Sequence, residues 1–383
     1  MTGVRSWRAL LAVPVLVAGA AVIGVASPAQ AARSVIDLGS LGGGFSSATG
    51  INNLGQVIGE STTANGTAHA FRWTRSAGMR NLGTLRGGNV SSAAAINDLG
   101  QVVGYSEIAS GQVRAFRWTP TGGMRNLGTL DGDSQAVAIN NSGQVGGRSD
   151  AANGDRHAFR WTPRGGMRDL GTLGGTESSV TAMNDLGQLA GSSSTRNGEE
   201  HAFRWTPTGG MRDLGTLGGA ESTAIDINDL GQVTGSSTTA NGENHAFRWT
   251  RTGGMRDLGT LGTTFSSATA INNVGQVAGF LIKAGIHQSA FRWTRTGGIR
   301  NLGHLGGNFS TGVGINDHGE VACDSVTTRN KSHACTWTRS AGMRDLGTLG
   351  GSESQAAGIN EQGQVTGDST TAKGENHATL WLP

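Results

Sequence analysis

The sequence contains little lysine, tyrosine, cysteine or proline. Its 383 residues include three lysines, one tyrosine, two cysteines and six prolines. Two cysteines allow at most one disulfide, which excludes a small disulfide-stapled scaffold. No stretch of the repeated region shows the apolar spacing of an amphipathic helix, which argues against an α-solenoid. Glycine, by contrast, occurs 65 times and indicates many tight turns.

A cleaved secretory signal is predicted over residues 1–31. Arg5 and Arg8 form a short basic start, residues 9–26 are an apolar run, and residues 29–31 (Ala-Gln-Ala) match a signal-peptidase site. No cysteine follows the apolar run to accept a lipid. We therefore expect a secreted, extracellular protein without a membrane anchor.

The charge of the chain also excludes some partners. The formal net charge falls from +3 to +1 without residues 1–31, because that segment carries two arginines and no Asp or Glu. Positive charge in the rest of the chain is mostly arginine at repeated places. A nearly neutral chain argues against nucleic acid or an anionic membrane as the main partner.

Internal repetition is the strongest signal in the sequence. Eight tryptophans are spaced 43 to 45 residues apart, at positions 73, 118, 161, 205, 249, 293, 337 and 381. Residues 32–383 therefore correspond to eight units of about 44 residues. Repeats of this length are typical of β-propeller blades and solenoids.

Each unit contains four short segments separated by turn residues. In the first unit they cover residues 46–52, 56–61, 69–74 and 79–85. None has helical periodicity, and four short strands in 44 residues match one propeller blade. We predict an all-β fold, an eight-bladed β-propeller of four-stranded antiparallel blades, as a single domain over residues 32–383.

The two ends of the repeated region differ from the other units. The last unit ends at "HATLWLP" without a following hairpin, and "VIDLG" opens the region with no hairpin before it. We expect residues 35–38 to supply the outer strand of the last blade, which would cover an exposed strand edge. The alternative is that every blade takes its four strands in chain order.

The repeated pattern "LGTLGG…S…A…IN…GQV.G.S…HAF.W" resembles the HAF-type extracellular repeat of bacterial secreted proteins. The resemblance spans all eight units and implies a secreted, propeller-like protein. It implies no shared reaction and no catalytic residues. This chain departs from the pattern at Arg114, Ser289, Cys323, Cys335 and Thr379.

The repeated polar residues have structural explanations. The histidine of "HAF" has no Cys or second His at metal-ligand spacing, so we expect it to bond backbone or a nearby Asp or Asn. The "IN[ND]xGQ" motif is turn chemistry, and the tryptophans are expected to fill the space between neighbouring sheets. No phosphate-binding loop and no nucleophile or metalloprotease motif occurs. We expect no catalytic residue, metal or cofactor.

Two departures from the repeat fall together in the seventh unit. Cys323 replaces the glycine of "QVxG", and Cys335 replaces the phenylalanine of "HAF". These positions lie 12 residues apart in every unit, on adjacent antiparallel strands. We predict a Cys323–Cys335 disulfide, with two buried free thiols as the alternative.

The loops indicate which face of the ring carries function. One set of turns is nearly invariant, whereas the "TTANGEN"-like loops and the starts of the inner strands vary between units and share the opposite face. The candidate ligand-binding residues at those strand starts are Phe45, Val90, Asp133, Glu177, Glu221, Phe265, Phe309 and Glu353. Apolar residues and acids follow one another in short runs of consecutive units, which predicts an opening with one apolar and one acidic side.

These observations favour a non-enzymatic, monomeric β-propeller that binds an extracellular ligand, a glycan or a surface protein. An enzyme remains an alternative: a hydrolase or lyase using Asp or Glu at the channel mouth would need two carboxylates at a suitable separation. Asp133, Glu177, Glu221 and Asp226 are the candidates for such a pair. A purely structural matrix protein is the third possibility.

Overall fold

The computed structural model describes residues 34–283 and 287–383. The expectation of an all-β chain is confirmed for these residues, which form strands and turns. The predicted signal over residues 1–31 lies outside the described residues. Within the described ranges, no helix is long and apolar enough to cross a membrane.

The strands follow one another in antiparallel groups of inner, second, third and outer strand. The inner strands are β2 (Gly42–Ile51), β6 (Ser91–Ile96), β10 (Ser134–Ile139), β14 (Gly174–Met183), β18 (Gly218–Ile227), β22 (Phe265–Ile271), β26 (Gly306–Ile315) and β30 (Gly350–Ile359). The second strands are β3 (Val57–Thr63), β7 (Val102–Glu107), β11 (Val145–Asp150), β15 (Leu189–Thr195), β19 (Val233–Thr239), β23 (Val277–Lys283), β27 (Val321–Thr327) and β31 (Val365–Thr371).

The third and outer strands complete the groups. The third strands are β4 (Ala68–Thr74), β8 (Val113–Thr119), β12 (Arg156–Thr162), β16 (Glu200–Thr206), β20 (Asn244–Thr250), β24 (His287–Thr294), β28 (Ser332–Thr338) and β32 (Asn376–Trp381). The outer strands are β5 (Gly78–Gly83), β9 (Gly123–Asn126), β13 (Gly166–Asp169), β17 (Gly210–Asp213), β21 (Gly254–Asp257), β25 (Gly298–Asn301) and β29 (Gly342–Asp345).

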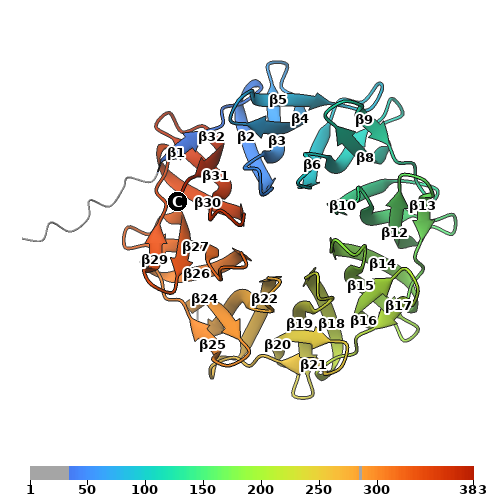
Figure 1. Cartoon of the computed structure of the whole chain (residues 1–383), viewed down its shortest axis with the longest axis vertical. Coiled ribbons are helices and arrows are strands. Elements are labelled where there is room, and N and C mark those ends of the chain that lie inside the picture. The colour runs from blue at the N-terminus through green and yellow to red at the C-terminus, as the bar shows by residue number, and fades with distance from the viewer. Residues whose placement is uncertain (1–33, 284–286) are drawn as a thin grey trace, which may run out of the picture. The chain divides into compact units, whose positions relative to one another are not determined.

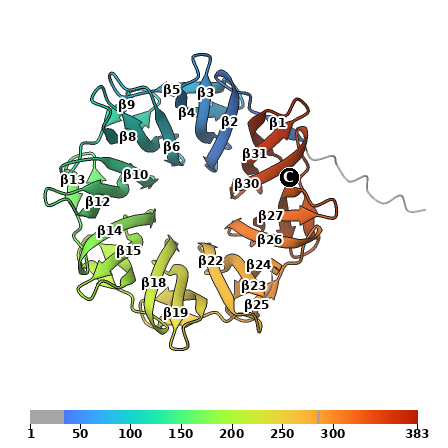
Figure 2. The same cartoon turned by 180° about the vertical axis from the view of Figure 1, so that it is seen from behind.

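The groups stand side by side in a ring, with the inner strands toward its centre (Figures 1 and 2). The outer strand beside β32 is β1 (Val35–Asp37), which pairs antiparallel with it. His377 in β32 bonds the carboxylate of Asp37 at 2.8 Å. The same His-to-Asp contact lies within one group elsewhere, as between His157 and Asp169, so the N-terminal strand completes a group that the C-terminal segment begins.

The hydrophobic core lies between neighbouring groups. One cluster joins Ile58 and Ala70 of one group to Val102, Phe116 and Trp118 of the next. Trp118 is 2% exposed, and the equivalent tryptophans occupy equivalent clusters. The expectation that tryptophan fills the space between sheets is confirmed. Burying each such side chain stabilises the fold by about 2–3 kcal/mol.

A closed circuit of asparagine side chains links the groups at the turn between inner and second strands. Asn52 donates from Nδ2 to the carbonyl oxygen of Asn97 at 2.9 Å, and Asn97 donates to the carbonyl of Asn140 in the same way. The circuit continues through Asn140, Asn184, Asn228, Asn272, Asn316 and Asn360. Asn360 then donates to the carbonyl of Asn52, so the last group is joined to the first.

Two parallel circuits repeat this closure. In the first, the side chain of the residue after each asparagine accepts a hydrogen bond from the backbone amide of the equivalent residue in the preceding group. The Glu361 amide closes this circuit by donating to the Asn53 side chain at 3.1 Å. A buried serine at the start of each inner strand accepts from the preceding group's third strand, ending with the Ala378 amide on Ser46. The turn motif therefore shapes its own turn and also joins neighbouring turns.

The predicted disulfide between Cys323 and Cys335 is present, with a Cα–Cα distance of 4.8 Å. In other groups a phenylalanine ring lies against a glycine at this place: a Cβ on Gly147 would lie 2.8 Å from the ring of Phe159. The structure adds a third change in the same group. In the first group Ala48 of the inner strand faces Gly59 of the second strand. In the disulfide-containing group Gly312 of the inner strand faces Cys323, so the glycine is on the inner strand there.

Replacing Asn228 by alanine tests the asparagine circuit. The change removes the 2.8 Å bond to the Asn272 carbonyl and takes from the Gln232 amide the side-chain oxygen that accepts its hydrogen bond. We expect the free energy of unfolding to fall by about 2–3 kcal/mol in chemical denaturation. The control is Asn241→Ala in an exposed loop of the same group, which should change it by less than about 0.5 kcal/mol. Equal effects would contradict the role of the circuit.

Candidate functional site

The two faces of the ring carry different connections. The turn face holds the turns between inner and second strands and the hairpins between third and outer strands. The loop face holds the loops between second and third strands and the segments that lead into the inner strands. All eight candidate ligand-binding residues lie on the loop face, where each inner strand begins.

The structure places these residues at the interfaces between neighbouring groups of strands. Each such interface is called a seam. Phe45 pairs with Asn376, and Glu177 pairs with Arg156, in single parallel bridges to the preceding third strand. Phe265 and Phe309 form the same bridge. The acids of the set are exposed, whereas Val90, Phe265 and Phe309 are half-buried. Each candidate residue therefore lies at its own seam and contacts different neighbours, so the eight residues do not form one joint site.

The neighbours of each candidate residue differ from seam to seam. Asp133 lies 3.6 Å from Arg114, and Glu353 lies 3.6 Å from Lys331. Phe265 stacks on Phe280 with ring centroids 5.8 Å apart. Phe45 is 38% exposed, so among the apolar candidates it is the one open to solvent.

A second variable position was missed in the sequence analysis. It is the residue after the "QVxG" glycine, near the middle of each second strand. Its occupants are Glu60, Tyr105, Arg148, Ser192, Ser236, Phe280, Asp324 and Asp368. Their charge and size change from unit to unit within a constant motif, and this variation was the signal that could have found them. In the structure Phe280 stacks on Phe265, and Arg148 and Ser192 line one pocket with Glu177.

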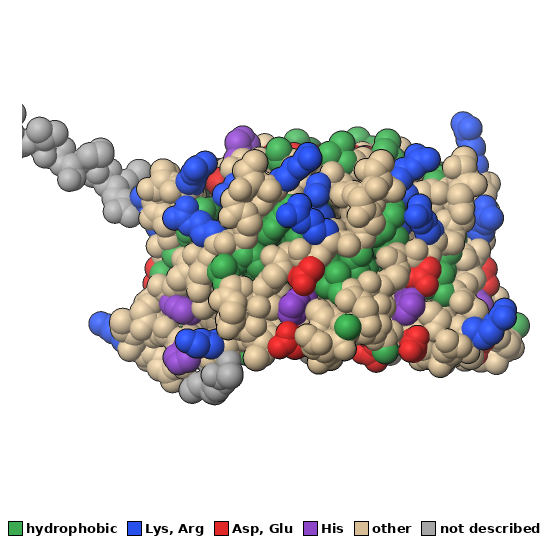
Figure 3. Space-filling model, turned by 90° about the horizontal axis from the view of Figure 1, so that it is seen from below, with side chains coloured by type: hydrophobic (Ala, Val, Ile, Leu, Met, Phe, Trp, Pro, Cys, Tyr) green, Lys and Arg blue, Asp and Glu red, His purple; other side chains and the backbone are tan. Residues whose placement is uncertain are grey.

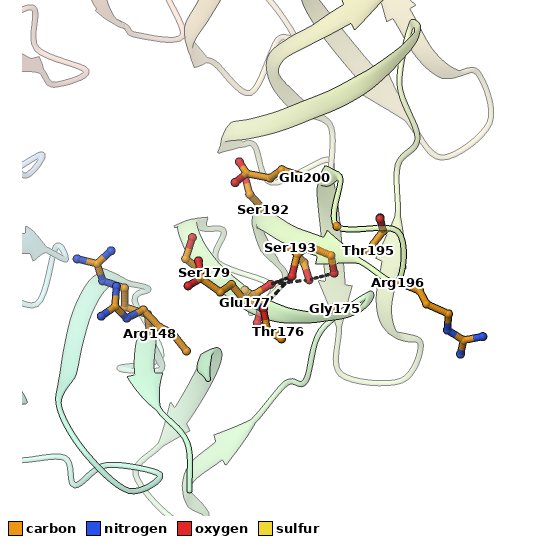
Figure 4. Close-up of a pocket in the computed structure, with 14 residues that line it drawn as sticks. Arg148, Gly175, Thr176, Glu177, Ser179, Ser192, Ser193, Thr195, Arg196 and Glu200 are labelled. Atoms are coloured by element: carbon orange, nitrogen blue, oxygen red, sulfur yellow. Dashed lines mark hydrogen bonds between the residues drawn. The ribbon is translucent and has the colours of Figure 1, made fainter. Parts of the chain in front are cut away.

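A pocket of about 490 Å³ lies at the seam between the group containing β10–β13 and the group containing β14–β17. Arg148 and Arg156 come from the first group, and Glu177, Ser179 and Ser192 come from the second. In Figure 4, Arg148 extends on one side of the pocket and Glu177 and Ser179 lie between it and Ser193, while Arg196 points away. Glu177 is thus the candidate residue that the structure places in a formed pocket.

The wall of this pocket is rich in hydroxyl groups, of which some are already used. Ser194 accepts from the backbone amide of Glu177 at 2.8 Å, and Ser193 donates to the Glu177 carbonyl. The buried hydroxyl oxygens of Ser192 and Thr195 have no hydrogen-bond partner among the described residues. Buried polar groups are normally paired, so these two are suited to a hydrogen-bonding ligand or ordered water.

A second seam pocket of about 650 Å³ lies between the groups of β26–β29 and β30–β31. Its lining includes Arg329, Lys331, His333 and Ser352. The loop at this seam reads "TTRNKSH", so Arg and Lys stand where other units carry Asn and Glu. Asn330 takes a positive φ of 59° there, at the position where most other units use glycine.

Buried carboxylates occupy two consecutive seams on the other side of the ring. Asp324 accepts from the Ala356 amide, and Asp368 accepts from the Ala48 amide and the Ser47 hydroxyl. Burial, opposed by the hydrogen bond from the Ala356 amide and assisted by repulsion from Asp368, raises the pKa of Asp324 to about 6. Burial also raises the pKa of Asp368, which lies near Glu60.

Asp226, a candidate for a catalytic pair, is held inside the protein. Its carboxylate accepts from the backbone amides of Ile227 and Ile271, and burial raises its pKa. It lies at the turn-face end of β18, away from the strand start that carries Glu221. The structure therefore does not bring Asp226 together with the loop-face acids.

The histidines of "HAF" pair with neighbouring acids or asparagine. His201 Nδ1 lies 2.8 Å from Asp213, and His69 contacts Asn81. The structural interpretation of these histidines is confirmed. No cluster of three His, Cys, Asp or Glu side chains suited to a metal occurs in the described part of the chain.

Comparisons with known proteins bear on the fold. No family model matches the chain, and no curated protein sequence matches it. Puromycin hydrolase, solved in complex with PGG, matches at a TM-score of 0.50 and 14% identity over 87% of this chain; the chain spans only 58% of that protein's length.

Two other solved structures also match. The β-propeller domain of the Trilobed protease from Pyrococcus furiosus has a TM-score of 0.48 and 10% identity, over 76% of this chain and 95% of that one. The BP39L lectin from Burkholderia pseudomallei has a TM-score of 0.45 and 9% identity, over 77% and 95%. The chain has a β-propeller type of fold, and at these identities the likeness extends to the fold alone.

Replacing Asp324 by asparagine tests the buried carboxylates. Because the folded-state pKa of Asp324 is raised from 3.8 to about 6, its contribution to stability is fully present below about pH 4 and is lost as pH rises through 6. The loss amounts to at most roughly 3 kcal/mol. Asparagine still accepts the Ala356 amide but cannot ionise.

We therefore expect Asp324→Asn to lose less free energy of unfolding than the wild type between about pH 4.5 and pH 7.5. Denaturation at both pH values measures the difference, with Asp131→Asn at an exposed position as the control. Parallel pH profiles for wild type and Asp324→Asn would show that Asp324 ionises without cost.

Proposed function

We propose that the protein is a secreted, eight-bladed β-propeller of the HAF-type repeat that binds an extracellular glycan on its loop face. The hydrogen-bond circuits support the blade number, because each links eight equivalent residues before it returns to its start. The disulfide is consistent with an oxidising, extracellular environment. The repeat itself supports membership in the HAF-type group.

The pocket beside Glu177 is the observation that carries the binding proposal. It combines two arginines, Arg148 and Arg156, with two carboxylates, Glu177 and Glu200, around a wall of serine and threonine hydroxyls. Carboxylates accept hydrogen bonds from sugar hydroxyls, and arginine donates to ring and carbonyl oxygens or to a sugar carboxylate. The free hydroxyls of Ser192 and Thr195 add two further partners. Such a set suits a polar ligand with many hydroxyls.

The variation between seams supports a specific site over a generic surface. The next seam keeps the acid, as Glu221, but has Ser192 in place of the arginine at Arg148. The equivalent position in the following group, in strand β19, is Ser236. The arginine–glutamate combination is therefore a feature of one seam within an otherwise repeated wall.

A glycan screen on residues 32–383, followed by titration of the best ligand, tests the proposal. Arg148→Ser and Glu177→Gln should each weaken binding about tenfold or more, because each removes a charge-assisted hydrogen bond. Glu221→Gln, the same change at the next seam, should leave affinity unchanged. Equal affinities for all variants, or no saturable binding, would overturn the proposal and favour a structural matrix role.

The same experiment decides the enzymatic alternative. Glu177 and Glu200 both line the pocket, as a pair of catalytic carboxylates would. If the bound glycan is cleaved during incubation and Glu177→Gln or Glu200→Gln abolishes the cleavage, the protein is a hydrolase or lyase. Recovery of intact glycan supports binding without catalysis.

A further inference from the structure

The near-neutral total charge conceals a separation of charge between the two faces. Figure 3 shows the ring from its edge, with Lys and Arg side chains gathered toward one face and most Asp, Glu and His side chains toward the other. The ion pairs that Lys and Arg form among the described residues involve Arg114, Arg156 and Lys331, all on the loop face. The arginines of the turn face form no such ion pair in the described part of the chain.

The turn-face arginines come from three repeated positions. The third strands contribute Arg72, Arg117, Arg160, Arg204, Arg248 and Arg292, the outer strands contribute Arg80, Arg125, Arg168, Arg212, Arg256, Arg300 and Arg344, and the hairpins contribute Arg75, Arg164, Arg251, Arg295 and Arg339. Most of the strand arginines lie over a tryptophan of the next group, usually as a pair: Arg204 and Arg212 both lie over the Trp249 ring, at 5.7 and 5.4 Å.

No carboxylate of the described residues forms an ion pair with these arginine clusters. Burial lowers the pKa of Arg204, and repulsion from Arg251 and Arg212 lowers it further. Its hydrogen bond goes to the neutral amide of Gln188, and its buried Nε has no partner among the described residues. Guanidinium groups held together in this way are arranged to share an anionic group from outside.

Exposed apolar side chains stand beside the same arginines. Leu54, Leu99, Leu186, Leu230 and Val274 occupy equivalent turn tips and are 60 to 67% exposed. The glycine after Leu230 is reached by Arg204, whose guanidinium lies 2.7 Å from the place of a Cβ on Gly231. The tips at Leu99, Leu186 and Val274 have the same arrangement with Arg72, Arg160 and Arg248. Four turn tips therefore combine a projecting apolar side chain with a guanidinium group.

We propose that the turn face is a docking surface for an anionic lipid membrane. The arginines would hold lipid phosphates, and the leucine and valine tips would enter the boundary between headgroups and acyl chains. The apolar tips favour a membrane over a soluble polyanion, which has no apolar layer to receive them. The carboxylates of Asp98, Asp185, Asp229, Asp317 and Glu361 also lie on this face, but they accept backbone amides and line small pockets at the centre of the ring.

Binding to vesicles tests this surface. Residues 32–383 are used, because the circuits, the core clusters and the β1–β32 pair all lie within this range. The protein should co-sediment with vesicles of phosphatidylcholine and phosphatidylglycerol, but not with phosphatidylcholine alone, and added salt should weaken the binding. No preference for the anionic vesicles would overturn the proposal.

Two variants separate the contributions, each with a matched control. The triple change Arg251→Gln, Arg295→Gln and Arg339→Gln should weaken vesicle binding by about tenfold or more, since each basic residue near an anionic surface contributes. Arg86→Gln, Lys283→Gln and Lys373→Gln remove the same charge from the loop face and should leave it unchanged. Leu230→Ser should weaken binding. Leu261→Ser should not, because Leu261 lies on the loop face, where it is 57% exposed compared with 67% for Leu230.

Two other occupants would be recognised in the same experiments. If Leu230→Ser binds vesicles like the wild type and a sulfated polysaccharide competes fully, the surface binds soluble polyanions and the membrane proposal is wrong. If the protein stacks through its oppositely charged faces, sedimentation will show association that the hairpin arginine variant abolishes without vesicles, and this also contradicts it. Glycan binding at Glu177 should be unchanged in all of these variants, so failure here leaves the proposed function untouched.

Discussion

The fold depends on one hydrogen bond repeated around the ring, from the buried asparagine side chain of one turn to the backbone carbonyl of the next. Asn52 accepts the amides of its own turn through Oδ1 and donates to Asn97 through Nδ2, so one side chain fixes both the turn and its neighbour. Because the circuit returns from Asn360 to Asn52, no group has a free side. Ring closure and turn shape are therefore the same constraint, which explains why this asparagine recurs in all eight units.

This constraint allows different positions to vary in sequence on the two faces. On the turn face, side chains must maintain the circuits, so change is confined to the projecting tips and the hairpins. On the loop face, the serine circuit fixes only the start of each inner strand, and neighbouring positions such as Glu177 and Arg148 can vary. A rigid ring with variable seams can evolve one specific pocket without disturbing the other seams.

Much of the fold could be predicted from the sequence, because a short segment that is ambiguous in one unit can be assigned when the same pattern recurs in eight units. The strand segments, the tryptophan core, the His–Asp pairs and the Cys323–Cys335 disulfide follow from residues that recur at a fixed spacing or depart from it together. The site was predicted only in part. Glu177 lies in a pocket, but Arg148 and Ser192 were missed, because their role depends on the packing of two groups that no spacing within one repeat reveals. The separation of charge between faces was missed for a related reason: Arg72 and Asp169 are mixed along the sequence and separate only when strands alternate in direction.

The asparagine circuit requires the junction between the last and first groups to be as tightly closed as every other seam. Hydrogen exchange of residues 32–383 measures this directly, through the amides that close each turn on its neighbour. We expect the Glu361 amide, bonded to Asn53 across the junction, to exchange as slowly as the Asp185 amide, bonded to Asp229 within the ring. Markedly faster exchange at Glu361 and in the strands β1 and β32 would show that the ring opens at its termini, and would contradict this expectation.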